Sequence, residues 1–264
     1  KSSIRAESSM QTKTPKILVL VEGEKTEEKI FKRLLDVYKI SDRHEIIAYK
    51  TDIYSLYGEM FVDNDADAID LVQLLKSREK DENKKKMLDS EFSDVILIFD
   101  LDPPSEKDTR KIADRYTDML RKMAAHFVES TDMGKLYINY PSVEAFYHMK
   151  DFPDREFADR VIALSDIHAK KYKTIVNSES KYRDYNKYAA SDSDVDYVVT
   201  ANIEKAKKIT GREDMPDTSA ILNAQLDYIE RKKEVSVLCT GVFYIYDFNP
   251  NLPGSRGGHK YDCR

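Results

Sequence analysis

The sequence predicts an α/β fold, in which helices flank a mostly parallel sheet and a mainly helical C-terminal extension follows. In the first part of the chain, short apolar runs alternate with helical patterns, as is typical of a parallel sheet. Two of these runs, 16–21 and 95–99, are continuously aliphatic or β-branched, which indicates strands buried on both faces. We expect one domain over residues 10–150, with an extension over residues 151–250 packed on it.

Four segments have the length and composition of strands, and they lie at residues 16–21, 45–49, 95–99 and 135–138. Between the first two, apolar side chains recur at helical spacing over residues 30–38, in a helix that we expect to begin at Thr26. A second helix is predicted on the apolar face of residues 112–127, with Ser105 as its N-cap.

Three further segments complete the predicted organisation. A third helix is expected over residues 66–76, and the charged stretch 78–86 reads as a solvated loop or helix end. The last apolar run, 235–248, fits either a strand or a buried helix, because periodicity does not separate the two.

Composition narrows the class of protein. The chain has 264 residues, of which 41% are hydrophobic, enough for a sizeable core. Its 43 basic and 48 acidic residues give a net charge of −5, which argues against a wholly basic nucleic-acid binder and leaves a local basic patch open. Two cysteines are too few for a disulfide framework. The first fifteen residues are polar, so we expect a cytoplasmic protein without a membrane segment.

Acidic side chains follow three of the predicted strands. Glu22 follows the first strand, Asp100 and Asp102 follow the third, and Glu144 follows the fourth. Because ligands of parallel α/β sheets bind at the carboxyl ends of the strands, we expect these acids to share one site. Carboxylates without histidine or cysteine suit Mg²⁺ or Mn²⁺.

The local sequence supports this metal site. Leu101 is expected to point into the core, which leaves Asp100 and Asp102 on one side, and Gly23 is expected to allow a tight turn after Glu22. A single acid after a strand is usually a helix cap or a solvated residue. The combination of Glu-Gly and Asp-Leu-Asp is more telling, since clustered acids repel one another unless a cation offsets them.

These residues resemble the motifs of the Toprim domain, which topoisomerases, bacterial primases and OLD-type nucleases share. The segments LVLVEGEKTEEKIF and VILIFDLD match its Glu-Gly and DxD motifs. VEGEKTE resembles in particular the stand-alone Toprim proteins of bacterial anti-phage systems, of the RloB-like and PARIS types. NYPSVEAFYH resembles their later glutamate-bearing segment. The resemblance spans about residues 16–150 and implies a Toprim-like, Rossmann-like fold.

The resemblance also implies an activity. The chain would be a Mg²⁺- or Mn²⁺-dependent endonuclease, cleaving DNA or an RNA such as tRNA. Glu22 would be a metal ligand or proton acceptor, Asp100 and Asp102 would bind Mg²⁺, and Glu144 would complete the site or hold a second ion. Lys25 would steady the scissile phosphate. Pro104 stands where relatives often carry an acidic or polar residue, which leaves the number of ions open.

The resemblance further implies a partner. Toprim proteins of defence systems commonly work beside an ATPase, and this sequence contains no GxxxxGK[ST] motif of its own. We therefore expect ATP-dependent control to come from another protein. The long tyrosine-rich and apolar C-terminal segments are compatible with a homodimer.

A segment rich in lysine and tyrosine follows in the extension. We expect its basic side chains to contact nucleic-acid phosphates, and they are Lys170, Lys171, Lys173, Lys181 and Arg183. The interleaved tyrosines Tyr172, Tyr182, Tyr185 and Tyr188 suit stacking on unpaired bases. The alternative is an ordinary solvated helix whose tyrosines pack inward.

Two other functions remain open. In a HAD-type phosphohydrolase, Asp100 would be the phosphorylated nucleophile and Asp102 the acid/base, but that interpretation leaves VEGEKTE unexplained; a DxD glycosyltransferase fits less well. A non-catalytic Toprim binding or sensor subunit would tolerate replacement of Glu22, Asp100 and Asp102.

Overall fold

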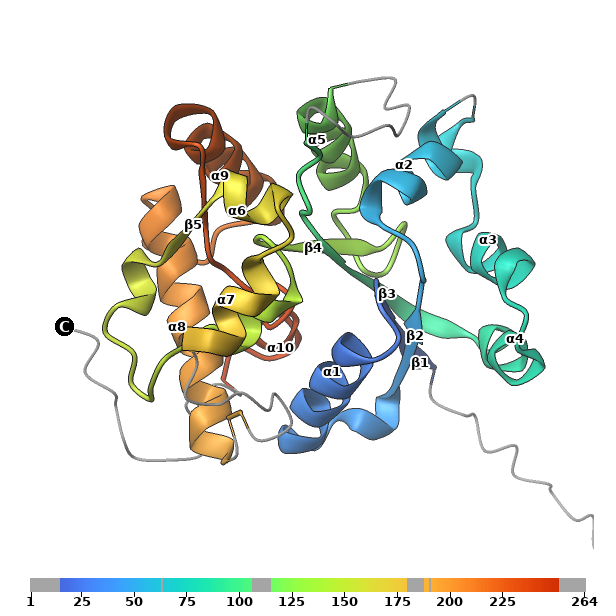
Figure 1. Cartoon of the computed structure of the whole chain (residues 1–264). Coiled ribbons are helices and arrows are strands. Elements are labelled where there is room, and N and C mark those ends of the chain that lie inside the picture. Colours follow the sequence, from blue (N-terminus) through green and yellow to red (C-terminus); the bar gives the residue numbers. More distant parts are fainter. Residues whose placement is uncertain (1–14, 63, 106–114, 180–187, 190, 252–264) are drawn as a thin grey trace, which may run out of the picture.

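A computed structural model describes residues 15–62, 64–105, 115–179, 188–189 and 191–251. Within these residues, four parallel strands form a sheet in the order β2-β1-β3-β4 (Figure 1). The strands are β1 (Lys16–Val21), β2 (His44–Ala48), β3 (Phe92–Asp100) and β4 (Lys135–Asn139). The predicted α/β class with a parallel sheet is confirmed, and the arrangement is compatible with a Rossmann-like fold.

Helices cover both faces of this sheet. Figure 1 shows α1 (Thr26–Val37) on one side, and α2 (Ile53–Phe61) and α5 (Tyr116–His126) on the other. The helix α1 begins at Thr26 as predicted and buries an apolar stripe that includes Phe31 and Leu34. The helices thus cover the two faces of the sheet, and the carboxyl ends of its strands border the cavity described below.

Three local predictions need correction. The helix expected over 66–76 is divided into the 3-10 turn η2 (Ala66–Ala68) and α3 (Leu71–Arg78), because Asp70 caps α3 through the backbone N–H groups of Val72 and Gln73. The charged stretch contains a helix, α4 (Glu82–Leu88), which starts at the Asp81 cap.

The third correction concerns α5. This helix begins at Tyr116, directly after Arg115, so Ser105 is not its N-cap. Ser105 lies instead in the loop that follows β3, where it borders the cavity described below.

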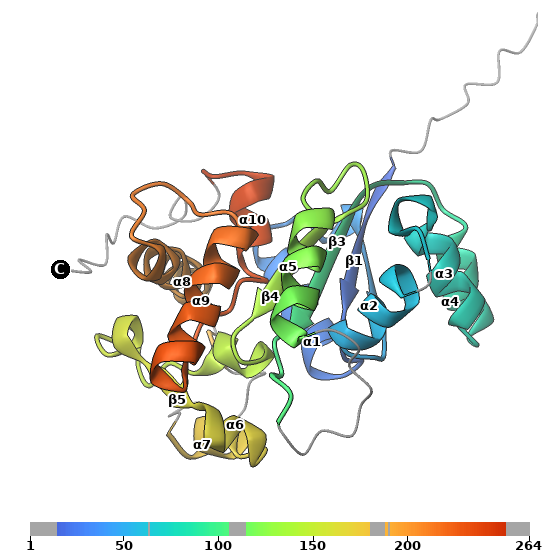
Figure 2. The ribbon, with the colours of Figure 1, turned by 90° about the horizontal axis from the view of Figure 1, so that it is seen from above.

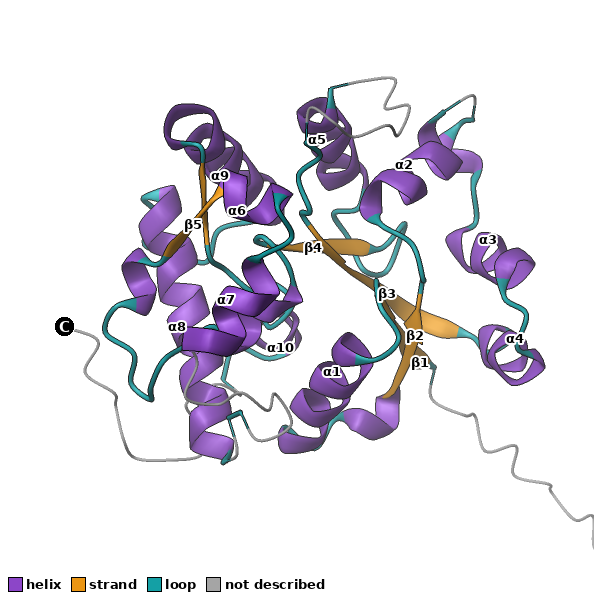
Figure 3. Ribbon diagram, in the orientation of Figure 1, coloured by secondary structure: helices purple, strands orange, loops and turns teal. Residues whose placement is uncertain are grey.

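The second half of the chain is mainly helical, as Figure 3 shows. Its helices and strands are β5 (Val161–Ala163), α6 (Leu164–His168), α7 (Tyr172–Glu179), α8 (Asp192–Thr210), α9 (Thr218–Lys232), β6 (Glu234–Ser236) and α10 (Phe243–Phe248). The strands β5 and β6 pair in antiparallel fashion. The helix α9 packs on α5 and β4, so this half lies beside the β4 edge of the sheet (Figure 2).

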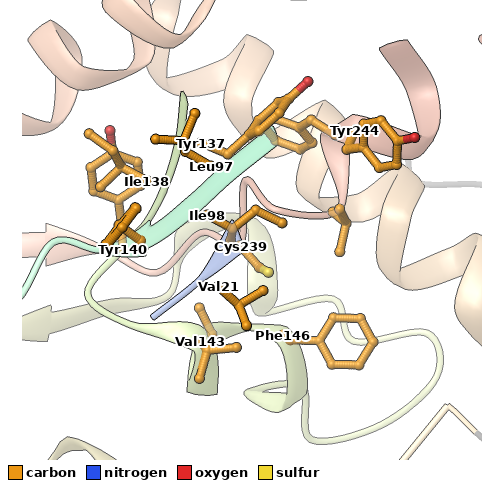
Figure 4. Close-up of a cluster of buried hydrophobic side chains, with 14 of the residues drawn as sticks. Val21, Leu97, Ile98, Tyr137, Ile138, Tyr140, Val143, Phe146, Cys239 and Tyr244 are labelled. Atoms are coloured by element: carbon orange, nitrogen blue, oxygen red, sulfur yellow. The ribbon is translucent and has the colours of Figure 1, made fainter. Parts of the chain in front are cut away.

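The apolar run 235–248 is strand, loop and helix in turn. Leu238 forms an antiparallel bridge with Tyr140, with N···O distances of 2.8 Å in both directions. The Thr240 hydroxyl donates to the Ile138 carbonyl at 2.7 Å. Around this return crossing the two halves share a buried cluster, in which Cys239 lies near Val21 (Figure 4). The domain boundary near residue 151 stays a prediction.

None of the helices in the described part of the chain combines the length and apolar character that crossing a membrane requires.

Candidate functional site

The carboxyl ends of β1, β3 and β4 meet at one open cavity of about 1370 Å³. All four acids predicted for the site line it, namely Glu22, Asp100, Asp102 and Glu144. They come together because β1 and β3 are neighbours in the sheet, as are β3 and β4. The structure thus brings these four residues to one place, which the sequence spreads over more than a hundred positions.

Glu22 and Asp100 are in direct contact. The backbone N–H of Asp100 donates to Glu22 Oε2 at 3.1 Å. Val21 pairs with Ile98 in the parallel register, so the Glu-Gly motif and the DxD motif leave the sheet side by side. The backbone of one motif therefore orients the carboxylate of the other.

Asp100 is oriented from β4 and from the return crossing. Asn139 at the end of β4 donates through Nδ2 to Asp100 Oδ1 at 3.1 Å. Oδ1 of the same Asn139 side chain accepts the Gly241 backbone N–H at 3.2 Å and lies 3.4 Å from Cys239 Sγ. The second half of the molecule therefore fixes the amide that holds the central aspartate.

Burial, together with repulsion between the acids, raises the pKa values of Glu22 and Asp100. Burial raises the pKa of Glu22 to about 8, and the nearby Asp102 and Asp52 carboxylates add to the shift. Burial also raises the pKa of Asp100 well above its ordinary value, followed by repulsion from Glu22. These carboxyls therefore favour the neutral form until a positive charge compensates them.

The DxD motif has one buried and one exposed acid. Leu101 is fully buried, as predicted, and Asp100 is 7% exposed. Asp102 is exposed, with a left-handed backbone at φ 31°, and its N–H donates to the Pro141 carbonyl at 3.2 Å. Both aspartates line the cavity, so the expectation that they face one site agrees with the structure.

Glu144 lies in the 3-10 turn η3 (Val143–Tyr147), which follows β4. Its carboxylate accepts the Ser142 hydroxyl at 2.7 Å and lies 3.4 Å from Lys173 Nζ. Glu144 is therefore held by its own turn and by a cation from the extension.

Sequence reasoning missed two further acids of the cavity, Glu27 and Asp52. Asp52 caps α2 through the Ser55 N–H at 2.8 Å, which gives no sequence signal of a site. A Cβ at Gly23 would lie 2.7 Å from Glu27 Oε2, and Gly23 does not have a positive φ. The glycine thus makes room for the Glu27 carboxylate, and the chain bends at Glu22 and turns at residues 24–25, in agreement with the expected turn.

The donor set fits a hard divalent cation. The acids offer carboxylate oxygens, which Mg²⁺ and Mn²⁺ prefer, and a cation would relieve the repulsion that raises their pKa values. In the described part of the chain, no three His, Cys, Asp or Glu side chains already form a metal-binding group.

The predicted basic residues divide into three sets. Lys25, Lys170 and Lys173 line the same cavity as the acids. Lys171 is turned toward Asp166, with 3.8 Å between Nζ and Oδ1. Lys181 and Arg183 lie outside the described residues.

The expected tyrosine stacking is wrong for the tyrosines that the structure describes. Tyr172 is 5% exposed and Tyr188 is fully buried, so neither ring can stack on a base. The Tyr188 ring packs against Phe146 and Phe152, and the Tyr172 ring packs edge-on against His148. Tyr182 and Tyr185 are not among the described residues.

Comparison with protein-family models, with curated proteins and with solved structures found no significant match to this chain. The interpretation of the site therefore depends on its own geometry and on the motifs themselves.

Proposed function

We propose that the protein is a metal-dependent nuclease of the Toprim type, which hydrolyses phosphodiester bonds at the cavity. The observation that carries the proposal is the contact between Glu22 and the Asp100 N–H at 3.1 Å, which joins the two motifs. A lone DxD motif would need no such partner on the neighbouring strand.

The side chains have complementary roles in this proposal. With a pKa of about 8, Glu22 can take up or release a proton near neutral pH, as a general base for water must. Glu22, Asp100, Asp102 and Glu144 would hold Mg²⁺ or Mn²⁺, which supplies charge stabilisation at the phosphoryl oxygens. Lys25, Lys170 and Lys173 would bind substrate phosphates at the same cavity.

A HAD-type phosphohydrolase has less support. Its mechanism needs Asp100 as an ionised and accessible nucleophile. Asp100 is 7% exposed, and burial raises its pKa well above the ordinary value. That alternative also assigns no role to Glu22, although Glu22 contacts Asp100 directly.

The biological setting is proposed from the motifs alone. The similarity of VEGEKTE to stand-alone defence proteins suggests an effector of bacterial anti-phage immunity, under the control of a partner ATPase. DNA and tRNA are both candidate substrates, since a phosphodiester is all that the acidic site requires.

The test is cleavage of supercoiled plasmid, single-stranded DNA and total tRNA with Mg²⁺ or Mn²⁺. Wild type should cleave one of these substrates, and Glu22→Gln should abolish the cleavage. Asp118→Asn is the matched control, because this exposed carboxylate on α5 pairs with Arg121, away from the cavity. Equal cleavage by Glu22→Gln would refute the proposal, and hydrolysis of p-nitrophenyl phosphate without nucleic-acid cleavage would favour the HAD-type alternative.

A silent wild type would point to the non-catalytic subunit or to a required partner. Metal binding separates these from a wrong site, because it needs no partner. Mn²⁺ should raise the melting temperature of wild type and of Asp118→Asn, but not that of Glu22→Gln.

A further inference from the structure

His148 connects both ends of α7 to the turn that carries Glu144. It directly follows η3, and its Nδ1 lies 3.2 Å from the Tyr172 hydroxyl. Its Nε2 lies 3.3 Å from Glu179 Oε2. Tyr172 and Glu179 are the first and last residues of α7, two turns apart on one face, so a single imidazole spans the helix.

Tyr172, His148 and Glu179 form a row of hydrogen bonds in which each side chain donates to the next. Burial raises the pKa of Tyr172, so the phenol keeps its proton and donates to Nδ1 of His148. Burial also lowers the pKa of His148 to about 4, so the ring is neutral at pH 7 and Nε2–H donates to Glu179. The ring packs edge-on against Tyr172, with 5.4 Å between centroids. The side chain of His148 is therefore fully engaged with α7.

His148 is fixed on its other side. Its carbonyl accepts Arg160 Nη1 at 2.8 Å, and the same guanidinium pairs with Asp154 at 2.6 Å. By contrast, the side chains that α7 itself buries are those of Tyr172 and Val176. The contacts of His148 and Arg160 thus hold α7, a short helix that buries few side chains of its own.

The helix α7 carries Lys173, one of the basic side chains that line the cavity. Lys173 follows Tyr172, and its ammonium lies 3.4 Å from Glu144 Oε1. The Lys173 side chain is 62% exposed, whereas that of Glu144 is 12% exposed, so the ammonium sits at the solvent side of the carboxylate. The same His148 stands four residues after Glu144 and contacts the residue before Lys173.

We propose that His148 is a positioning residue, which docks α7 and so holds Lys173 where its ammonium contacts a phosphate of a nucleic-acid substrate. The inference depends on the nuclease proposed above and identifies α7 as the wall of the cavity that binds the substrate. His148 does not touch the substrate itself. Its effect is transmitted through Tyr172 and Glu179.

The test is a binding cycle on the full chain in a Glu22→Gln background, which prevents cleavage. The probes are a fluorescein-labelled 20-nucleotide single strand of DNA, its RNA equivalent and its DNA duplex, measured by anisotropy in metal-free buffer at several salt concentrations. Tyr172→Phe should weaken binding about three- to tenfold, the range of one lost hydrogen bond. Lys173→Gln should lower the slope of log K against log salt by about 0.7 for a single strand or about 0.9 for a duplex.

The coupling between the two variants decides the question. If Tyr172 acts through Lys173, Tyr172→Phe alone also lowers the salt slope, and adding it to Lys173→Gln changes nothing further. Glu179→Gln keeps an acceptor for His148 and should bind better than Glu179→Ala. The matched control is Tyr38→Phe, which removes another buried hydroxyl, bonded to Asp196 at 2.7 Å, and should leave affinity and slope unchanged.

Additive effects, an unchanged salt slope in Tyr172→Phe, equal binding by both Glu179 variants, or no binding of any probe would each overturn the inference. Failure of the nuclease proposal is a separate result. If the variants are coupled in binding but wild type never cleaves, the nuclease proposal fails and the role of His148 in substrate binding stands. If wild type cleaves but the variants are additive, the nuclease proposal stands and the role of His148 fails.

Discussion

Two buried carboxylates, one in each half of the molecule, have opposite surroundings. In the extension, Asp154 pairs with Arg160 at 2.6 Å and accepts the Lys150 N–H at 2.7 Å. Burial would raise its pKa, but the hydrogen bonds from Arg160 and from the Lys150 and Glu156 backbone, together with the Arg160 charge, outweigh burial and lower it. In the cavity, Asp100 accepts the Asn139 amide, while burial and the neighbouring Glu22 carboxylate raise its pKa.

The difference distinguishes a structural ion pair, at Asp154, from a candidate binding site, at Asp100. Around Asp154 the protein neutralises the charge itself, and the ion pair fixes the loop that supports His148. Around Asp100 the protein gathers further acids, a costly arrangement that makes sense if an external cation completes it. Replacing each carboxylate should therefore have opposite effects on stability.

The largest effect is expected from Asp100→Asn. Loss of a ligand and of its charge should reduce nuclease activity at least about 100-fold. The same change removes repulsion from Glu22 and keeps an acceptor for Asn139, so the melting temperature in metal-free buffer should stay equal or rise. Cleavage assays and thermal unfolding on one preparation check both. A variant that is inactive because it is less stable would contradict this account.

Asp154→Asn should act in the reverse sense. It leaves the Arg160 guanidinium buried without its counter-charge, and breaking such a pair costs about 3 to 5 kcal/mol of unfolding free energy. Chemical denaturation measures this directly. Asp227→Asn, which breaks an exposed pair with Arg231, is the control and should change stability by less than about 1 kcal/mol. A similar loss of unfolding free energy in the two variants would mean that the buried Asp154–Arg160 pair does not stabilise the extension as we describe.

Metal ions should change the unfolding free energy by a smaller amount, and only where Asp100 is present. At a concentration a hundredfold above its Kd, Mn²⁺ should stabilise wild type by about 2.7 kcal/mol. Asp100→Asn should lose most of this gain, while Asp227→Asn should keep it. Melting curves over a Mn²⁺ series, with Ca²⁺ for comparison, test the expectation. Equal stabilisation of Asp100→Asn would place the ion elsewhere.

Per pH unit, the effects of pH are the smallest of these, and the two halves should respond with opposite sign. Glu22 has a pKa of about 8 in the folded protein and an ordinary value of 4.5. The folded state therefore binds more protons between these values, and stability in metal-free buffer should fall as pH rises from 4.5 to 8. One such group contributes at most about 1.4 kcal/mol per pH unit. Melting temperatures should show a flatter profile for Glu22→Gln, and an identical profile would argue against the shift.

Lys205 in α8 should give the opposite slope. Its ammonium donates to the Phe157 and Arg160 carbonyls at 2.8 and 2.7 Å, and burial lowers its pKa to about 7 from 10.5. The unfolded state then binds more protons between these values, so stability should rise with pH over that window. In Lys205→Met this rise should disappear, whatever the variant's absolute stability. Urea unfolding at pH 7, 8 and 9 provides the measurement.

Part of this molecule is determined by local sequence. The continuous aliphatic runs of β1 and β3 identify strands buried on both faces, because no polar residue interrupts them. Parallel strands expose their carboxyl ends at one edge, so the positions of Glu22 and Asp100 already indicate that they meet. The start of α1 also follows from its own residues.

Only the tertiary structure decided what surrounds those acids. Asn139 and Gly241 orient Asp100 from positions about a hundred residues apart, and Asp52 enters the cavity as an ordinary helix cap. Tyr172 is buried rather than free to stack, because its ring packs against His148, which also contacts its hydroxyl. Periodicity reports only which side of an element is apolar, whereas the pKa values of the carboxyls depend on burial and on charges brought from other elements. The sequence therefore located the site, and packing between the two halves determined its chemistry.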